Sequence, residues 1–146
     1  MATAAYNRLL APRPAAALPA KPPHRPKWSA KRRANAAFYN QACADVAEIT
    51  TPYTEPVSES IFNQYTIRVP RRDAFKAHLA SKGIGHSVYY PLPLHLQPCF
   101  AYLGYKEGQC PESERASAEV VSLPIYPELT QGQLDEVVSA VRGFFG

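Results

Sequence analysis

The sequence lacks the features that define several common classes of protein. It contains no apolar run near the roughly 18 residues that a membrane span requires, so we expect a cytoplasmic protein without membrane contact. Only three of its 146 residues are cysteines, and their irregular spacing indicates reduced thiols rather than a disulfide framework or a zinc site. The four histidines form neither an HExxH motif nor a pair with cysteines at ligand spacing, so we expect no metal site.

Signatures of nucleotide-dependent and hydrolytic enzymes are missing as well. The chain has only seven glycines and no GxxxxGK[ST] loop to cradle a phosphate. Gly83-Ile84-Gly85 lacks the third glycine and the helix start of a dinucleotide-binding motif. No nucleophile elbow is present, and Ser-His-Asp or Cys-His arrangements stay open from one sequence. Composition and spacing alone therefore assign no catalytic residue.

Acidic residues are absent from the first 33 positions, which hold eight basic residues. The remaining 113 residues hold eight basic and twelve acidic ones, so the net charge of +4 belongs to the N-terminus and the body is no nucleic-acid-binding module on charge grounds. Six of the fifteen prolines lie within residues 1–27, which predicts a Pro/Ala-rich, basic, irregular tail. We interpret this tail as unstructured, with an organelle transit peptide and a basic arm that touches nucleic acid as the alternatives.

The pattern changes at Trp28, which predicts one folded domain over residues 28–146. Helices are predicted over residues 28–47 and 71–82, a helix that begins at Pro111, and strands at residues 65–69 and 88–90. In the first helix the apolar residues at helical spacing are Ala34, Phe38, Ala42 and Val46. In the second, Phe75 and Leu79 are predicted to face inward, and Gly83 is predicted to end the helix.

The C-terminal helix has the clearest pattern. Thr130-x-x-Gln133 forms a capping box at its start, and an extended segment with an edge-strand proline, residues 122–127, precedes it. The apolar residues of this helix fall on one face and are Leu134, Val137, Val138, Val141, Phe144 and Phe145. Because helices and strands mix without strict alternation, we predict an α+β fold with a small antiparallel or mixed sheet and flanking helices.

The most informative stretch covers residues 86–103. Tyr89, Tyr90 and His95 lie there beside a rigid Pro-x-Pro turn, and such loops hold polar side chains toward a ligand at low entropic cost. The alternative is that the tyrosines are ordinary strand aromatics and that His95 caps or fills a gap.

Four motifs in this order resemble the C-terminal domain of the DegT/StrS family of sugar aminotransferases. They are residues 60–70 (SIFNQYTIRVP), 89–98 (YYPLPLHLQP), 102–108 (YLGYKEG) and 122–130 (SLPIYPELT). The resemblance runs from about Trp28 to Phe145.

The resemblance implies a fold-type-I enzyme that uses pyridoxal phosphate to move an amino group onto a keto-sugar carried by a nucleotide. In full-length members a large N-terminal domain holds the cofactor and its Schiff-base lysine, and the small domain closes over the site, typically in a homodimer. This chain resembles the small domain alone, and none of its six lysines lies in a segment like that of the family lysine. We therefore expect a truncated domain that binds no cofactor by itself and is inactive alone, with residues 1–27 as a degraded remnant of a longer coding sequence.

The resemblance also assigns roles to four residues. Tyr89 and Tyr90 match a pair that often reads His-Tyr and faces the sugar, so both are expected to bind substrate. His95 matches the motif histidine and is expected to touch the substrate or orient its loop. Asn63 matches a polar position near the cofactor pocket and is therefore expected to bind the cofactor. For each, the alternative is a hydrogen bond that only stabilises the loop.

Two further functions stay open. The chain is either half of a split enzyme that docks on a separately encoded large domain through an exposed apolar surface, or, less expected, a nucleic-acid-binding protein that uses its basic tail.

Overall fold

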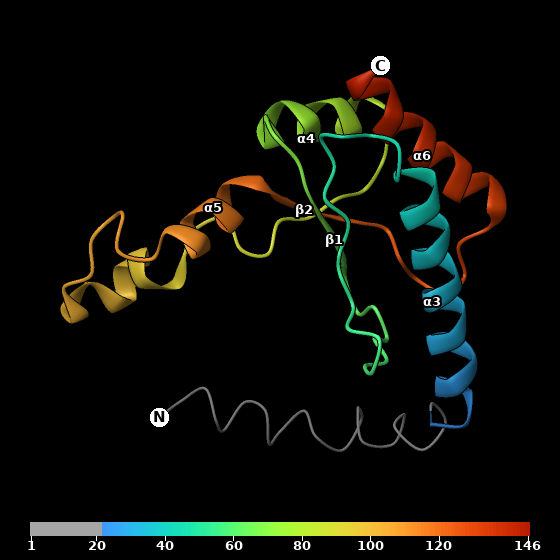
Figure 1. Cartoon of the computed structure of the whole chain (residues 1–146), viewed down its shortest axis with the longest axis horizontal. Coiled ribbons are helices and arrows are strands. Elements are labelled where there is room, and N and C mark those ends of the chain that lie inside the picture. Colours follow the sequence, from blue (N-terminus) through green and yellow to red (C-terminus); the bar gives the residue numbers. More distant parts are fainter. Residues whose placement is uncertain (1–21) are drawn as a thin grey trace, which may run out of the picture.

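The computed structural model describes residues 22–146 of this chain, so most of the expected irregular tail, residues 1–21, lies outside the described residues. The structure is a small α+β fold with an antiparallel sheet, as the sequence predicted (Figure 1). Its elements in chain order are the 3-10 helix η2 (Pro22–His24), α3 (Arg25–Ala42), β1 (Tyr65–Arg68), α4 (Arg72–Ser81), the 3-10 helices η3 (Leu94–Leu96) and η4 (Pro98–Leu103), α5 (Pro111–Glu119), β2 (Val120–Leu123) and α6 (Gln131–Phe145).

The sheet is a two-stranded antiparallel pair of β1 and β2. Tyr65 lies opposite Leu123 and Ile67 opposite Val121, and these four apolar side chains are buried on one face. Since side chains alternate along a strand, the polar residues between them point to the other face. There the hydroxyl groups of Thr66 and Ser122 lie 2.7 Å apart. At the end of the strands, the guanidinium group of Arg68 forms an ion pair with the carboxylate of Glu119.

Two isolated bridges widen the sheet, at Thr50 with Arg68 and at Ser87 with Ser122. The strand predicted at residues 88–90 is wrong in extent, because Ser87 pairs with β2 whereas residues 88–90 do not. The chain leaves the sheet edge there and enters the proline-rich turn at residues 91–93.

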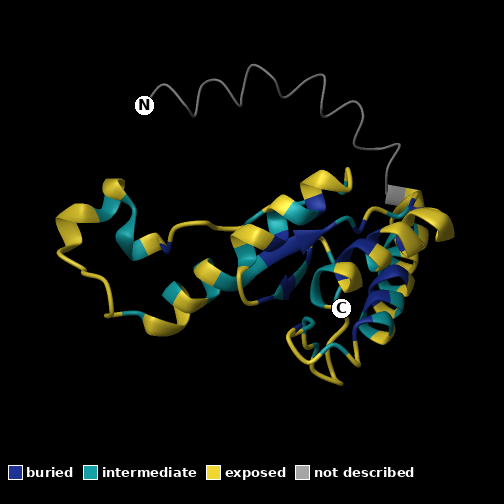
Figure 2. Ribbon diagram, turned by 90° about the horizontal axis from the view of Figure 1, so that it is seen from above, coloured by how far each residue is buried: buried dark blue, intermediate teal, exposed yellow. Residues whose placement is uncertain are grey.

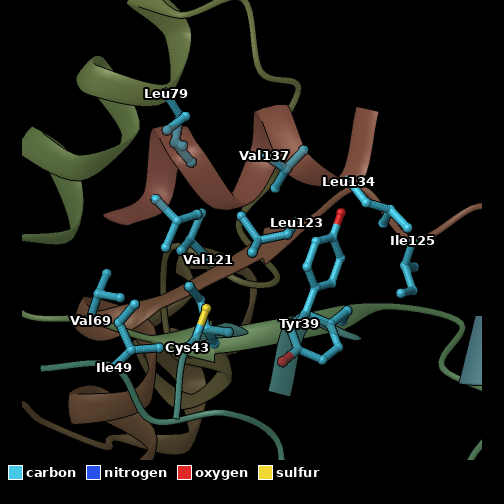
Figure 3. Packing of buried hydrophobic residues seen from close by; sticks show 14 of the residues in the cluster. Tyr39, Cys43, Ile49, Val69, Leu79, Val121, Leu123, Ile125, Leu134 and Val137 are labelled. Atoms are coloured by element: carbon cyan, nitrogen blue, oxygen red, sulfur yellow. The ribbon is translucent and has the colours of Figure 1, made fainter. Parts of the chain in front are cut away.

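Helices α3, α4 and α6 cover the apolar face of the sheet. Figure 3 shows side chains from all three helices and β2 meeting in one cluster, with Leu123 of β2 near Val137 of α6 and Tyr39 of α3. The buried residues of β1 belong to the same cluster. Phe75 and Leu79 of α4 are fully buried, as their spacing predicted, and Phe75 meets Phe144 of α6 edge to face at 5.3 Å. The core therefore lies between the sheet and these helices.

Helix α3 begins at Arg25, ahead of the boundary expected at Trp28, with Pro26 in its first turn, where the missing N–H is not needed. It ends at Ala42, and residues 43–48 form turns. The predicted inward stripe is wrong by one position along the helix. The residues that are buried are Asn35, Ala36, Tyr39 and, just beyond the helix, Cys43.

Both predicted helix-end signals are present. Gly83 has φ +71° and its N–H donates to Ala80, while the N–H of Ile84 donates to Leu79, which is a Schellman motif. At the start of α6, Thr130 accepts a hydrogen bond from the Gln133 N–H, and the Gln133 side chain accepts one from the Thr130 N–H.

Residues 90–115 extend away from this core, and we call them the arm. Figures 1 and 2 show η3, η4 and the start of α5 projecting to one side, with a largely exposed surface. The exposed large apolar side chains on the arm are Tyr90, Leu92, Leu94, Tyr102, Leu103 and Tyr105. Within residues 22–146, no helix is both long and apolar enough to cross a membrane.

Candidate functional site

A pocket of about 430 Å³ lies at the edge of the sheet, and we call it the edge pocket. It is built from the approach to β1, the loop after α4, and β2 with the segment that follows. Two of the four candidate residues, Asn63 and Tyr89, line it together although they lie far apart in the sequence. The full lining consists of Asn63, Gln64, Gly85, His86, Ser87, Tyr89, Ser122, Leu123, Pro124, Ile125 and Tyr126.

One face of α3 fixes the backbone on two sides of the edge pocket. Arg32 donates from Nη1 to the carbonyl groups of Phe62 and Asn63, at 3.1 and 3.2 Å. One turn further, the buried Asn35 amide donates to the Tyr126 carbonyl at 3.1 Å. After another turn, the Tyr39 hydroxyl donates to the Pro124 carbonyl at 2.9 Å.

These three side chains follow the spacing of a helix face, so α3 holds both walls of the pocket at once.

The loop after α4 is held from the opposite side. The N–H of Ser87 donates to the Ser122 carbonyl at 3.2 Å, and the N–H of Ser122 donates to the Ser87 carbonyl at 2.7 Å. This pair of bonds adds residue 87 to the edge of β2. The side chains of His86 and Tyr89 on either side are therefore attached to a fixed backbone.

The edge pocket has both polar and apolar lining groups, and no described residue with a permanent charge lines it. Among residues 22–146, no aspartate, glutamate, lysine or arginine lines it. Its polar groups are amides, hydroxyls and the imidazole of His86, which offer hydrogen bonds of both directions. The exposed Tyr89 and Tyr126 add aromatic surface.

Pyridoxal phosphate does not fit this pocket by itself. The cofactor needs an amine for a Schiff base and a carboxylate beside the pyridine nitrogen, and no described residue that lines the pocket supplies either group. The described residues also form no group of three or more histidine, cysteine or acidic side chains that could hold a metal ion. The pocket offers hydrogen-bonding groups beside apolar surface, without a charged side chain among the described lining residues.

Asn63 is positioned by a strained residue. Phe62 has φ +45°, a left-handed conformation that a bulky side chain rarely adopts. The strain is held in place because the Phe62 N–H donates to the Ser60 hydroxyl at 3.2 Å and its carbonyl accepts from Arg32. Such strain is typical of functional sites, where the surrounding structure over-determines the conformation.

Tyr90 follows Tyr89 but does not line the edge pocket. The two rings meet edge to face at 6.0 Å, and Tyr90 is 69% exposed. Its hydroxyl is therefore available to a group that approaches from outside the described residues.

His95 lies in the arm, apart from the other candidates. Its Nε2 is 3.0 Å from Glu114 Oε1, and the ring meets Tyr105 edge to face. The same carboxylate accepts from the N–H groups of Gly108 and Cys110 at 2.9 and 3.2 Å. These bonds, the one from Gly108 first, lower the pKa of Glu114. In this structure Glu114 thus ties His95, the loop at residues 104–110 and α5 together.

Sequence reasoning passed over several residues that build the site. His86 stood inside the informative stretch without a role, and Arg32, Asn35 and Tyr39 were hidden in a helix assigned only an apolar face. The signal that marks them is polar residues spaced three and four apart on a helix that must bury one face.

Residues 3–142 match the DegT/DnrJ/EryC1/StrS aminotransferase family. The chain belongs to this family. The match reaches back to residue 3, so the family resemblance starts earlier than the motifs from Trp28 onward indicated. Members of this family are pyridoxal-phosphate aminotransferases.

The chain is also similar to individual curated proteins. The chain is 46% identical over 142 residues to a pleiotropic regulatory protein of Geobacillus stearothermophilus. The aligned region covers 96% of this chain and 38% of that protein. It is 37% identical over 119 residues to the dTDP-3-amino-3,4,6-trideoxy-alpha-D-glucose transaminase of Streptomyces venezuelae, covering 82% of this chain and 31% of that one.

A crystal structure of S. venezuelae DesV with a ketimine intermediate matches with a TM-score of 0.81 and 36% identity, over 83% of this chain and 33% of that chain. The chain therefore spans about a third of the length of these aminotransferase-family relatives.

Proposed function

We propose that this chain is the substrate-facing small domain of a pyridoxal-phosphate-dependent aminotransferase that acts on nucleotide-linked keto-sugars. In this proposal Tyr89 and Tyr90 face the sugar side of a composite site, and the cofactor and its lysine belong to a different domain. Asn63, which the resemblance placed near the cofactor, is here assigned to the sugar side because it shares the edge pocket with Tyr89. The observation that carries the proposal is the edge pocket, where Asn63 and Tyr89 line one surface that combines amide, hydroxyl and imidazole groups with aromatic rings and has no charged side chain among the described residues. The transaminase relative of S. venezuelae, named for a dTDP-linked sugar, supports the substrate class.

His95 has a different task in this proposal. Its bond to Glu114 keeps the arm in shape, and the arm carries Tyr90 at its base. We assign His95 to positioning the loop rather than to contact with the sugar.

Binding of a nucleotide sugar tests the proposal directly. We expect dTDP-glucose to shift the nuclear magnetic resonance (NMR) signals of Tyr89 and Tyr126 in the isotope-labelled chain. Because one wall of a composite site supplies only part of the contacts, the dissociation constant should be on the order of millimolar. Absence of any saturable shift in the edge pocket up to tens of millimolar would contradict the proposal, and free glucose serves as the comparison ligand.

If the sugar contacts lie on this chain and the cofactor and its lysine lie on a different domain, the chain alone does not transaminate. Incubation with pyridoxal phosphate followed by borohydride reduction should give no stoichiometric adduct by intact mass, only scattered modification of exposed lysines. A single adduct that maps to one lysine would show a cofactor site within this chain and would refute the division.

The exposed apolar side chains of the arm support its use as a docking surface for another domain. Leu94, Tyr102 and Leu103 are 63%, 79% and 51% exposed. Exposed apolar side chains that gather on one part of a protein are typical of interaction surfaces. We propose that this surface packs on the cofactor-binding domain of the family fold, within a homodimer or as half of a split enzyme. Co-purification of this chain with a cofactor-binding domain of a family member, and loss of it in an arm variant, is the test.

Nucleic-acid binding through the basic tail remains a separate prediction. Most of that tail lies outside the described residues, and nothing in the described residues favours this function.

A further inference from the structure

We propose that His86 is a substrate-contacting residue that reads a hydroxyl group of the sugar through its Nε2 atom. This inference rests on the proposed function and adds a residue for which the family resemblance gave no role. It is drawn from the hydrogen bonding of the imidazole, from the rigidity of its backbone and from the chemistry of its surroundings.

The hydrogen bond of the ring determines which nitrogen is left for a ligand. His86 Nδ1 lies 3.1 Å from the carbonyl oxygen of Ile84. A carbonyl oxygen only accepts hydrogen bonds, so Nδ1 carries the proton. In the neutral imidazole Nε2 is then an acceptor. Among residues 22–146, Nε2 has no hydrogen-bond partner, and the half-buried ring lines the edge pocket.

The backbone around His86 is fixed on both sides. On one side, the N–H of Ile84 donates to Leu79 at 2.9 Å as part of the helix end, and Ile84 packs against the core. On the other side, Ser87 makes two hydrogen bonds with Ser122 of β2. An acceptor held in this way can select among ligands, because little entropy is lost when a ligand binds to it.

The surroundings favour a sugar over the charged parts of the ligand. Among the described residues, none with a permanent charge lines the pocket, so the diphosphate of a nucleotide sugar would find no counter-charge there. A sugar ring offers hydroxyl groups that both donate and accept. The amide of Asn63 and the acceptor of His86 match these groups, and the tyrosine rings present apolar faces to the C–H groups of the sugar.

Two substitutions separate ligand contact from a purely structural role. In His86→Asn the shorter amide can still donate to the Ile84 carbonyl, but nothing replaces Nε2. In His86→Gln the longer amide places a polar atom near the position of Nε2. If His86 only holds the turn, His86→Asn should bind the sugar like the wild type. If His86 contacts the sugar, His86→Gln should bind it like the wild type and His86→Asn should bind it more weakly.

The experiment is an NMR titration of the full labelled chain with dTDP-glucose, and with dTDP as the sugar-free probe. We expect the His86 ring signals to shift with dTDP-glucose and not with dTDP. We expect His86→Asn to weaken dTDP-glucose binding roughly three- to tenfold, the range for one lost hydrogen bond, and His86→Gln to stay within about twofold of the wild type.

Several results would overturn the inference while the proposed function stands. They are shifts of Tyr89 and Tyr126 without a shift of His86, unchanged binding by His86→Asn, equal losses in both variants, or an equal response of His86 to dTDP alone. If dTDP-glucose moves no signal of the edge pocket, the proposed function fails, and this inference fails with it.

Discussion

The hydrogen bond from Tyr39 to Pro124 allows a sharp test of how α3 holds the edge pocket. Tyr39 is fully buried, and its hydroxyl donates to a carbonyl in the pocket wall at 2.9 Å. Replacing Tyr39 by Phe removes the donor, keeps the ring and leaves the half-buried carbonyl without this partner. A lost hydrogen bond of this kind lowers the free energy of unfolding by about 1–2 kcal/mol. For a domain of this size that corresponds to a fall in Tm of roughly 3–8 °C.

Tyr65 supplies a matched control. It is also fully buried, its ring contacts that of Tyr39 at 5.1 Å, and its hydroxyl donates to Asn40 Oδ1 at 2.6 Å, away from the pocket. Tyr65→Phe should therefore lower stability by a similar amount without changing the pocket. Burial raises the pKa of both tyrosines, so both hydroxyls stay protonated donors at neutral pH.

The assay combines thermal unfolding with the NMR signals of Ile125 and Tyr126. We expect both variants to lose stability, and only Tyr39→Phe to shift or broaden the signals of the pocket wall and weaken dTDP-glucose binding. The reasoning is refuted if Tyr39→Phe leaves Tm unchanged. It is refuted equally if Tyr65→Phe disturbs Ile125 and Tyr126 as much as Tyr39→Phe does.

Three further predictions concern other parts of the chain. Because the pKa of Glu114 is lowered in the folded state, its contribution to stability is present above its ordinary pKa of 4.5 and is lost as the pH falls through the folded-state value. The difference in unfolding free energy between the wild type and Glu114→Gln should therefore shrink on acidification. A difference that is constant from neutral to acidic pH would contradict this. Thr130→Ala should destabilise the domain by about 1 kcal/mol in denaturant titrations because it removes the cap of α6, and Thr130→Ser, which keeps the hydroxyl, should not. Leu94→Ser with Tyr102→Ser should change stability by less than about 0.5 kcal/mol, since both residues are exposed, yet reduce co-purification with a cofactor-binding domain; retained co-purification would count against the arm as the docking surface.

Local chemistry made some elements predictable from the sequence. The capping box at Thr130, the inward residues Phe75 and Leu79, and the stop at Gly83 depend on neighbours within a few positions, and the structure confirms all of them. The short strand predicted at residues 88–90 is absent because strand formation does not depend on neighbouring residues alone. Its aromatic residues favour a strand, but whether a strand forms depends on a partner in β2 that the local sequence does not contain.

The buried face of α3 shows what periodicity alone misses. Hydrophobicity selected Phe38, which is half-buried, whereas Asn35 is 1% exposed. A buried amide is tolerated because the Tyr126 carbonyl, 91 positions along the chain, accepts its hydrogen bond. Such a partner is visible only after the chain has folded. The candidate site followed the same rule, because the sequence alone did not show that Asn63 and Tyr89 share one pocket while His95 bonds to Glu114 in the arm.

The edge pocket is held in shape through backbone carbonyl groups rather than through the side chains that line it. Arg32, Asn35 and Tyr39 all donate to backbone carbonyl groups, which are present whatever side chain a position carries. The walls therefore keep their place when a lining residue changes, and the change alters only the groups offered to the ligand. It follows that His86→Asn should weaken sugar binding with little loss of stability, whereas substitutions at Asn35 should lower stability first and weaken binding as a consequence.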